Sequence, residues 1–246
     1  MNTLIYDGTF EGYLTCFALS ENFSDREITF LKSKSSQIPL FSESHIVKSN
    51  REKALIIWNL LEHKSPKIAK TIYFAFLSDE IGIESILTKF ILYFLSPDIS
   101  NPELVSDYRK YLETLQIKVA QEKARMEQNI QFIQLQSGIF YAEIHPVFNS
   151  TPLITKELKH RFKGATWVIH DTKRNYGIQC VKNKLEYIQG LNRQLSDVIL
   201  DRDLTKELNM HPPLNTHTSN TFLKQTEPAL MPLSRRKPNL RMQKAG

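Results

Sequence analysis

The chain has 246 residues, of which 41% are hydrophobic and 10% aromatic, and its formal net charge is +6 at pH 7. This composition is typical of globular proteins, and the length is enough for one large domain or two small ones. The longest apolar clusters, residues 72–77 and 90–95, are too short to cross a bilayer. The two cysteines lie outside any metal-type spacing, and the opening residues show no secretory signal pattern. We therefore expect a cytoplasmic protein that uses no metal, cofactor or membrane.

Positive charge is concentrated near the C-terminus. Residues 209–246 hold six Lys or Arg residues and one acid, a net charge of +5, which leaves +1 for residues 1–208. Five of the eleven prolines lie in the same segment, so we expect a disordered basic tail. Within it, Arg235, Arg236 and Lys237 form a short basic run that suits phosphate backbones or an acidic partner. The alternative is a solvated tail that aids solubility.

The first half of the chain predicts one short strand followed by helices. Residues 4–6 form an apolar run that stops at Asp7-Gly8, and residues 11–20 then show helical spacing. Between about residues 50 and 128, apolar residues again recur every three or four positions, which predicts four more helices. Three of these carry start signals: Ser49-x-x-Glu52, Ser65-Pro66 and Ser100-x-x-Glu103.

After residue 129 the apolar period changes to two, which predicts strands. The expected strands cover residues 130–132, 140–144, 167–171, 176–181 and 185–187. The third and fourth form a β-hairpin, and helices are expected at 151–162 and 191–208. The sequence therefore predicts an α+β fold, with a helical middle packed against an antiparallel sheet over about residues 129–190. We expect the N-terminal strand to join that sheet, which makes residues 1–208 a single domain.

Several short motifs follow one another along the chain. Residues 6–12 read YDGTFEG, Trp58 and residues 77–80 (LSDE) lie in the helical middle, and residues 119–126 fit V-x-x-E-x-x-R-M. Residues 146–153 fit P-x-x-N-x-x-P-L. The remaining matches are Arg161-Phe162, Trp167, Asp171, Arg174 and Tyr176-Gly177. Together, residues 4–188 resemble a bacterial family of DNA metabolism proteins built around a domain of unknown function.

This resemblance implies a role in DNA metabolism or repair. Genes of that family often lie beside one for a radical-SAM protein with helix-hairpin-helix elements, so DNA and such a protein are the implied partners. Some members are fused to a uracil-DNA glycosylase-like domain, but this sequence shows no such domain, and no glycosylase activity is carried over. The chain departs from the family pattern at Gln131, Glu157 and His170.

Three carboxylates are candidate catalytic residues, and each has a structural alternative. Asp7 and Asp171 precede turns, where an aspartate commonly accepts bonds from the backbone N–H groups that follow. Glu122 lies on the apolar stripe of its predicted helix, three residues before Arg125 on the same face. A partly buried ion pair there either orients a site or fixes the packing.

Arg125, Arg174 and Tyr176 are the candidate nucleic-acid contacts in the folded part. Arg174 lies at the tip of the predicted hairpin, and its guanidinium group suits phosphate or carboxylate. Tyr176 either stacks on a base or packs on Trp167 across the hairpin. We expect the guanidinium of Arg174 and the phenol of Tyr176 to point outward for recognition.

The sequence lacks the nucleophile-elbow, phosphate-loop, dinucleotide and zinc-protease motifs, so no motif indicates whether the protein is an enzyme. We favour a DNA metabolism or repair accessory protein that binds nucleic acid or docks a DNA-modifying enzyme. The first alternative is an enzyme that acts on DNA or a modified base through a pocket of Asp7, Glu122, Arg125 and Asp171. The second is a protein-interaction scaffold that binds no nucleic acid.

Overall fold

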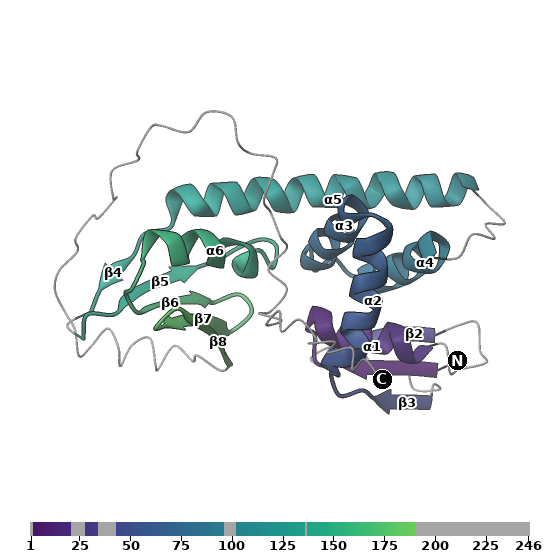
Figure 1. Ribbon diagram of the computed structural model, residues 1–246, viewed down its shortest axis with the longest axis horizontal. Coiled ribbons are helices and arrows are strands. Elements are labelled where there is room, and N and C mark those ends of the chain that lie inside the picture. The colour runs from purple at the N-terminus through teal and green to yellow at the C-terminus, as the bar shows by residue number, and fades with distance from the viewer. Residues whose placement is uncertain (1, 21–27, 34–42, 96–101, 136, 190–246) are drawn as a thin grey trace, which may run out of the picture.

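The computed structural model describes residues 2–20, 28–33, 43–95, 102–135 and 137–189. The expected helix over 191–208 and the basic tail with Arg235, Arg236 and Lys237 lie outside these ranges. Within them, the chain forms six helices and eight strands, and the strands make up two sheets (Figure 1). This arrangement confirms the α+β class.

The N-terminal sheet contains three parallel strands in the order β2-β1-β3. They are β1 (Asn2–Tyr6), β2 (Ile28–Lys32) and β3 (Glu43–Ile46). The central strand β1 is buried from Thr3 to Tyr6, as expected for a parallel strand with neighbours on both sides. The prediction that β1 joins the C-terminal sheet is therefore wrong. Its neighbours β2 and β3 are short and carry polar residues, so neither showed a strand pattern in the sequence.

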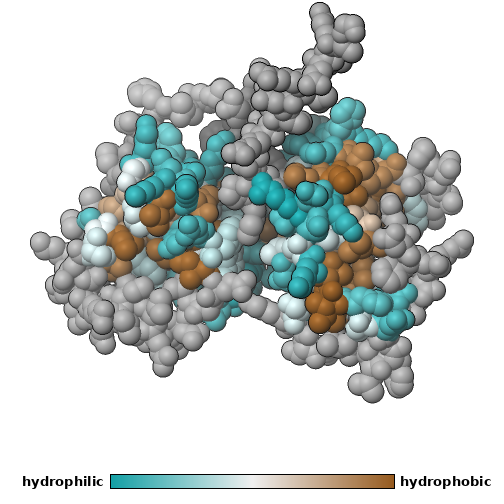
Figure 2. Space-filling view, turned by 60° about the horizontal axis from the view of Figure 1, so that its bottom comes forward, coloured by the Kyte–Doolittle hydropathy of each residue, from teal (hydrophilic) through white to brown (hydrophobic). Residues whose placement is uncertain are grey.

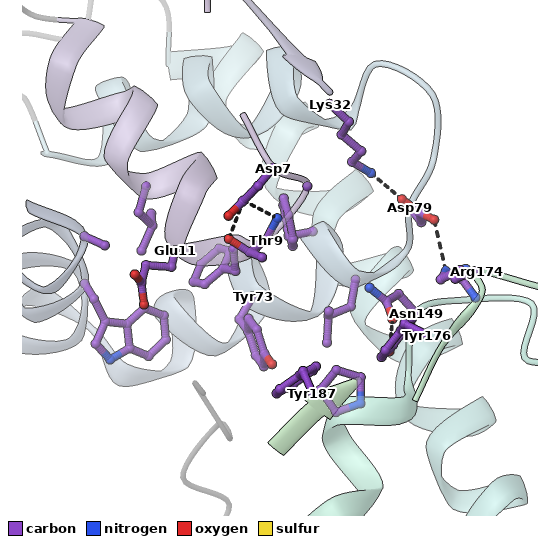
Figure 3. A pocket seen from close by; sticks show the side chains of 18 of the residues that line it. Asp7, Thr9, Glu11, Lys32, Tyr73, Asp79, Asn149, Arg174, Tyr176 and Tyr187 are labelled. Atoms are coloured by element: carbon purple, nitrogen blue, oxygen red, sulfur yellow. Dashed lines mark hydrogen bonds and ion pairs between the residues drawn. The ribbon is translucent and has the colours of Figure 1, made fainter. Parts of the chain in front are cut away.

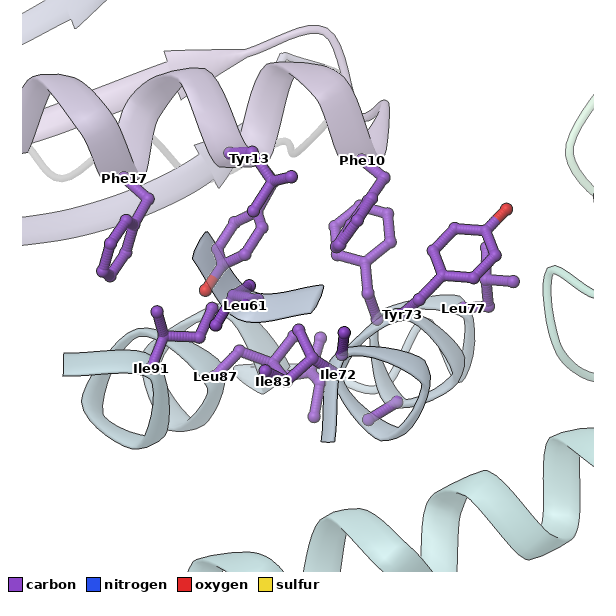
Figure 4. Close-up of a cluster of buried hydrophobic side chains, with 14 of the residues drawn as sticks. Phe10, Tyr13, Phe17, Leu61, Ile72, Tyr73, Leu77, Ile83, Leu87 and Ile91 are labelled. Atoms are coloured by element: carbon purple, nitrogen blue, oxygen red, sulfur yellow. The ribbon is translucent and has the colours of Figure 1, made fainter. Parts of the chain in front are cut away.

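Four helices pack together beside this sheet: α1 (Phe10–Ser20), α2 (Arg51–Lys64), α3 (Pro66–Leu77) and α4 (Ile83–Leu95). Aromatic side chains of α1 point toward α3 and α4, as Phe10, Tyr13 and Phe17 show in Figure 4. Their burial stabilises this half by about 1.5–3 kcal/mol for each large side chain. Below, "N-terminal half" means β1–β3 and α1–α4.

The helix starts agree only in part with the sequence signals. Ser65 caps α3 with Pro66 in the first turn, as predicted. The cap of α2 is Asn50 rather than Ser49, because the Asn50 side chain accepts the hydrogen bond from the Lys53 N–H at 3.0 Å. The helix expected from residue 79 begins at Ile83, since a residue with positive φ, Asp79 at 57°, cannot continue a helix.

Helix α5 (Pro102–Asn129) runs along both halves of the molecule (Figure 1). Leu112, Leu115 and Val119 belong to the hydrophobic core of the N-terminal half. Met126, two turns later, belongs to the second core, beneath the C-terminal sheet. One helix thus contributes to both cores and sets how the halves face each other.

The C-terminal sheet is mixed, not antiparallel as predicted, with the strand order β4-β5-β6-β7-β8. Its strands are β4 (Ile133–Gln134), β5 (Phe140–Ile144), β6 (Trp167–Asp171), β7 (Tyr176–Val181) and β8 (Lys184–Gln189). Helix α6 (Thr151–Arg161) connects β5 to β6, and such a crossover makes this pair parallel, while the other pairs are antiparallel. The predicted hairpin of β6 and β7 is confirmed. Below, "C-terminal half" means β4–β8 and α6.

None of the helices in the described ranges has the length and apolar character needed to cross a bilayer. On the face in Figure 2, hydrophobic residues are visible on both halves, separated by hydrophilic ones rather than gathered in one patch.

Candidate ligand-binding cavity

A cavity of about 440 Å³ lies between the two halves. The N-terminal half contributes the loop after β1, the first turn of α1, and parts of α2 and α3, while the C-terminal half contributes the hairpin tip and residues near α6 (Figure 3). The cavity thus adjoins the carboxyl end of β1, whose neighbours lie on both of its sides. In open parallel sheets, this is the position where ligands bind.

Aromatic rings from both halves form much of the wall. In the N-terminal half, the ring centroid of Phe10 lies 5.0 Å from that of Tyr73 and 5.8 Å from that of Trp58. In the C-terminal half, Tyr176 and Tyr187 stack at 6.2 Å with an interplanar angle of 18°. Burial raises the pKa of Tyr187 to about 12, so its phenol stays protonated at neutral pH and can donate a hydrogen bond.

The YDGTFEG motif builds the loop between β1 and α1. Asp7 accepts hydrogen bonds from the Thr9 N–H at 2.9 Å, the Thr9 hydroxyl at 2.6 Å and the Ser49 hydroxyl at 2.7 Å. Gly8 adopts a φ of 84°, which favours glycine. A Cβ atom on Gly12 would lie 2.4 Å from Asp7 Oδ1, so glycine lets the carboxylate lie against α1. Asp7 is therefore held in the turn, as its structural alternative predicts, although it also lines the cavity.

A charged cluster closes the cavity at the hairpin side. Asp79 pairs with Lys32 of β2 and with Arg174 of the hairpin tip, whose Nε lies 3.1 Å from Asp79 Oδ2. Burial acts to raise the pKa of Asp79, but hydrogen bonds and charges from Lys32 and Arg174 outweigh it and leave this pKa below its ordinary value. All three residues line the cavity, and Figure 3 shows them as one chain of contacts.

The sequence led us to expect that the guanidinium of Arg174 points outward with free donors. The structure contradicts this expectation. Besides Asp79, the guanidinium donates to Asp171 Oδ2 at 3.2 Å and to the carbonyl oxygens of Pro146 at 3.2 Å and Val147 at 3.1 Å. Its side chain is only 12% exposed. Arg174 therefore holds the hairpin against the rest of the fold. Asp171 is fully buried and accepts the Arg174 N–H at 3.0 Å, which is the predicted turn role.

Tyr176 lines the cavity but does not pack across the hairpin on Trp167. Trp167 lies opposite Cys180, whereas Tyr176 lies opposite Asp171. The Tyr176 hydroxyl donates to Asn149 Oδ1 at 2.6 Å, and its ring stacks on Tyr187. The phenol is therefore directed to Asn149, another residue of the cavity wall.

Glu122 and Arg125 lie away from the cavity. The Glu122 carboxylate is buried and accepts the backbone N–H groups of Val147 at 2.7 Å and Phe148 at 2.8 Å, together with the Ser150 hydroxyl at 3.2 Å. Arg125 pairs with Glu122 at 3.3 Å through a side chain that is 64% exposed. Of the four residues in the predicted catalytic pocket, only Asp7 lines this cavity. Glu122 instead fixes the loop that carries Asn149.

Sequence reasoning missed Glu11 and the tyrosines Tyr73 and Tyr187. Glu11 lies in the first turn of α1 and lines the cavity, where its carboxylate makes no hydrogen bond or ion pair with the described residues. Acidic residues are common in the first turn of a helix because they interact favourably with the helix dipole. Neither the residue type nor the position of Glu11 therefore indicated a binding role. Tyr73 lies in an apolar helical run and Tyr187 in the last strand, and both positions favoured a packing role.

Comparison with known families identifies part of the chain. Residues 81–227 match the family model described as a domain of unknown function, DUF4130. The chain belongs to the DUF4130 family. The matched segment begins just before α4 and includes α5 and the whole C-terminal half, so in this DUF4130 protein the cavity combines residues inside the match with residues before it. No curated protein matches the chain.

Proposed function

We propose that this DUF4130 protein is an accessory protein of DNA metabolism that binds single-stranded nucleic acid and takes one unstacked nucleotide into the cavity. The observation that carries the proposal is the cavity itself, which has aromatic walls from both halves. The carboxylate of Glu11 lies at one end, and the cations Lys32 and Arg174 lie at the other. Its volume of about 440 Å³ falls in the usual range for small-ligand sites, roughly 300–1,000 Å³.

The aromatic walls suit a ligand that is flat and has apolar faces. Tyr73 and Trp58 approach from the N-terminal half, and the stacked pair of Tyr176 and Tyr187 approaches from the C-terminal half. Bases stack on such rings with about 1–3 kcal/mol for each base, whatever their sequence. A base that enters between the halves would contact both, so binding would also stabilise their arrangement.

The charges support a phosphate at the hairpin end. Lys173 is exposed and, among the described residues, makes one hydrogen bond, to the Val147 carbonyl at 2.6 Å, so its ammonium group keeps donors for a phosphate oxygen. Among the described residues, the other cations that line the cavity are Lys32 and Arg174, and both are already paired with Asp79. We therefore expect one or two phosphate contacts and a shallow salt dependence, with a slope of about −0.7 for each phosphate neutralised.

The implied partners fit the same proposal. A protein that holds an unstacked nucleotide would present it to an enzyme that modifies or repairs DNA, and the radical-SAM helix-hairpin-helix protein is the partner that the family resemblance implies. The tail residues Arg235, Arg236 and Lys237 would add further phosphate contacts. A variant with alanine at these three positions separates their contribution from that of the cavity.

Fluorescence anisotropy with a labelled single-stranded oligonucleotide tests the proposal. Tyr187→Ala removes one stacking ring and should weaken binding about tenfold, because stacking on an aromatic ring contributes about 1–3 kcal/mol for each base. Tyr111→Ala is the matched control, because Tyr111 is 38% exposed, close to the 37% of Tyr187, and lies on α5 outside the cavity. The control should bind like the wild type. Absence of binding by the wild type, or equal binding by Tyr187→Ala, contradicts the proposal.

A further inference from the structure

The acidic residues of the cavity differ in whether described residues already donate hydrogen bonds to their carboxylates. Asp7 is bonded to Thr9 and Ser49, and Asp79 is paired with Lys32 and Arg174. The Glu11 carboxylate also lines the cavity, but no described residue donates to it. A ligand that fills the cavity removes water from this carboxylate, so that ligand has to supply hydrogen-bond donors in return.

The position of Glu11 shows which part of a nucleotide would meet it. In Figure 3, Glu11 and Arg174 lie on opposite sides of the cavity, with Tyr73 and Tyr187 between them. A nucleotide whose phosphate faces Lys173, the neighbour of Arg174 in the chain, would place its base between the tyrosines. The outer edge of that base would then face Glu11.

We infer that Glu11 makes the cavity selective for guanine, an inference that rests on the proposed function. A carboxylate is an acceptor only, and its two oxygens suit two adjacent donors. Guanine offers such a pair, a ring N–H next to an exocyclic amino group. Adenine and cytosine place one amino donor beside a ring acceptor, and thymine places its ring N–H between two carbonyl oxygens that repel a carboxylate. Hypoxanthine keeps the ring N–H of guanine and lacks the amino group.

The test uses labelled strands of five nucleotides that differ only at the central base: guanine, hypoxanthine or thymine, with thymine at the other four positions. The wild type should bind the guanine strand about tenfold more tightly than the thymine strand, the discrimination expected of one bidentate contact. The hypoxanthine strand should fall between them. Glu11→Gln should reduce the tenfold preference to less than about threefold, because a carboxamide has only one acceptor oxygen.

Two further variants keep the result interpretable. Glu157→Gln makes the same chemical change at an exposed position of α6 and should keep the full preference. Glu11→Asp retains the charge on a shorter side chain and should lower the preference without changing the melting temperature. If the wild type binds all three strands equally, or if Glu11→Gln keeps the preference, the role of Glu11 is refuted while strand binding stands. If the wild type binds none of the strands, both proposals fail.

Discussion

Arg174 and Asp79 are 95 residues apart in the chain, yet the Arg174 Nε donates to Asp79 Oδ2 at 3.1 Å. Arg174 lies at the tip of the hairpin in the C-terminal half, and Asp79 lies in the turn between α3 and α4. Asp79 also pairs with Lys32, so this carboxylate links β2 of the first sheet to the hairpin of the second. The pairing spans the rim of the cavity and fixes the distance between its two walls.

Asp79→Asn tests this link through the pH dependence of stability. Lys32 and Arg174 lower the pKa of Asp79 in the folded protein, so its carboxylate stabilises the fold above the unfolded-state pKa, near 4. That stability is lost as the pH falls through the lower, folded-state pKa. At pH 7, Asp79→Asn should lower the free energy of unfolding by about 1 kcal/mol, since the pair is partly exposed. At the acid end of the range the two proteins should converge.

Urea unfolding between pH 2.5 and pH 7 provides the measurement. Asparagine suits this position because it tolerates the positive φ of 57° that Asp79 adopts. Asp107→Asn is the control, because Asp107 is 73% exposed and, within the described part of the chain, makes only a surface pair with Lys110 on α5. A deficit of the same size at every pH would show that the charge of Asp79 is not what matters.

Local signals in the sequence were sufficient for much of the fold. Ser65-Pro66 predicts the start of α3 because the cap and the proline act within one turn. The hairpin of β6 and β7 is predicted for the same reason, since its tip and alternation lie within fifteen residues of sequence. The parallel pair of β5 and β6 depends instead on where α6 packs, which no short pattern shows.

The cavity could not be predicted for a related reason. Asp7, Glu122 and Asp171 are all carboxylates at positions where a functional role and a structural role leave the same pattern. The structure separates them by their partners: Glu122 and Asp171 are buried and bonded to nearby backbone N–H groups, and Asp7 alone of the three lines the cavity. Glu11 and Tyr187 line the same cavity only because α5 places the two halves against each other.

Gly12→Ala should displace the Asp7 carboxylate. The added Cβ would lie 2.4 Å from Asp7 Oδ1 and 2.8 Å from Ser49 Oγ, so these side chains have to move and the hydrogen bonds of Asp7 weaken. Gly12 lies in the first turn of α1, where alanine gains at most about 1 kcal/mol over glycine, whereas each lost hydrogen bond costs about 1 kcal/mol. We expect a net destabilisation of about 1 kcal/mol when two of these bonds are lost.

A double-mutant cycle isolates this contact. In an Asp7→Ala background the nearest clash is absent, so Gly12→Ala should become neutral or stabilising by up to about 1 kcal/mol. Thermal or urea unfolding of the four proteins measures the coupling. Equal effects of Gly12→Ala in both backgrounds would mean that glycine is not required there for the approach of Asp7.

Glu122→Gln should destabilise the protein and weaken ligand binding. Both carboxylate oxygens accept backbone N–H groups, from Val147 at 2.7 Å and Phe148 at 2.8 Å, and a carboxamide places an NH₂ group against one of these donors. An unsatisfied buried donor costs about 1–3 kcal/mol, so we expect a loss of about 2 kcal/mol in the free energy of unfolding. Because the loop continues to Asn149, oligonucleotide affinity should fall as well.

Glu113→Gln provides the comparison for Glu122→Gln. Glu113 lies on the same helix, but its side chain is 34% exposed and pairs with Arg109 one turn earlier. Such a surface pair contributes about 0.3–0.5 kcal/mol, so this variant should be nearly as stable as the wild type and bind the oligonucleotide normally. If the two variants lose the same stability, the buried contacts of Glu122 do not hold the loop.

Lys173→Gln should weaken strand binding without altering the choice of base. The exposed ammonium group donates to the Val147 carbonyl, as does the guanidinium of Arg174, which Figure 3 shows on the side of the cavity opposite Glu11. We therefore expect the ammonium group to meet a phosphate and not a base. Loss of one phosphate contact should make the slope of log affinity against log salt shallower by about 0.7, equally for the guanine and thymine strands. Lys118→Gln removes the same charge from an exposed position of α5 outside the cavity and should leave the slope unchanged. A change of base preference in Lys173→Gln, with an unaltered slope, would place the base rather than the phosphate at the hairpin end.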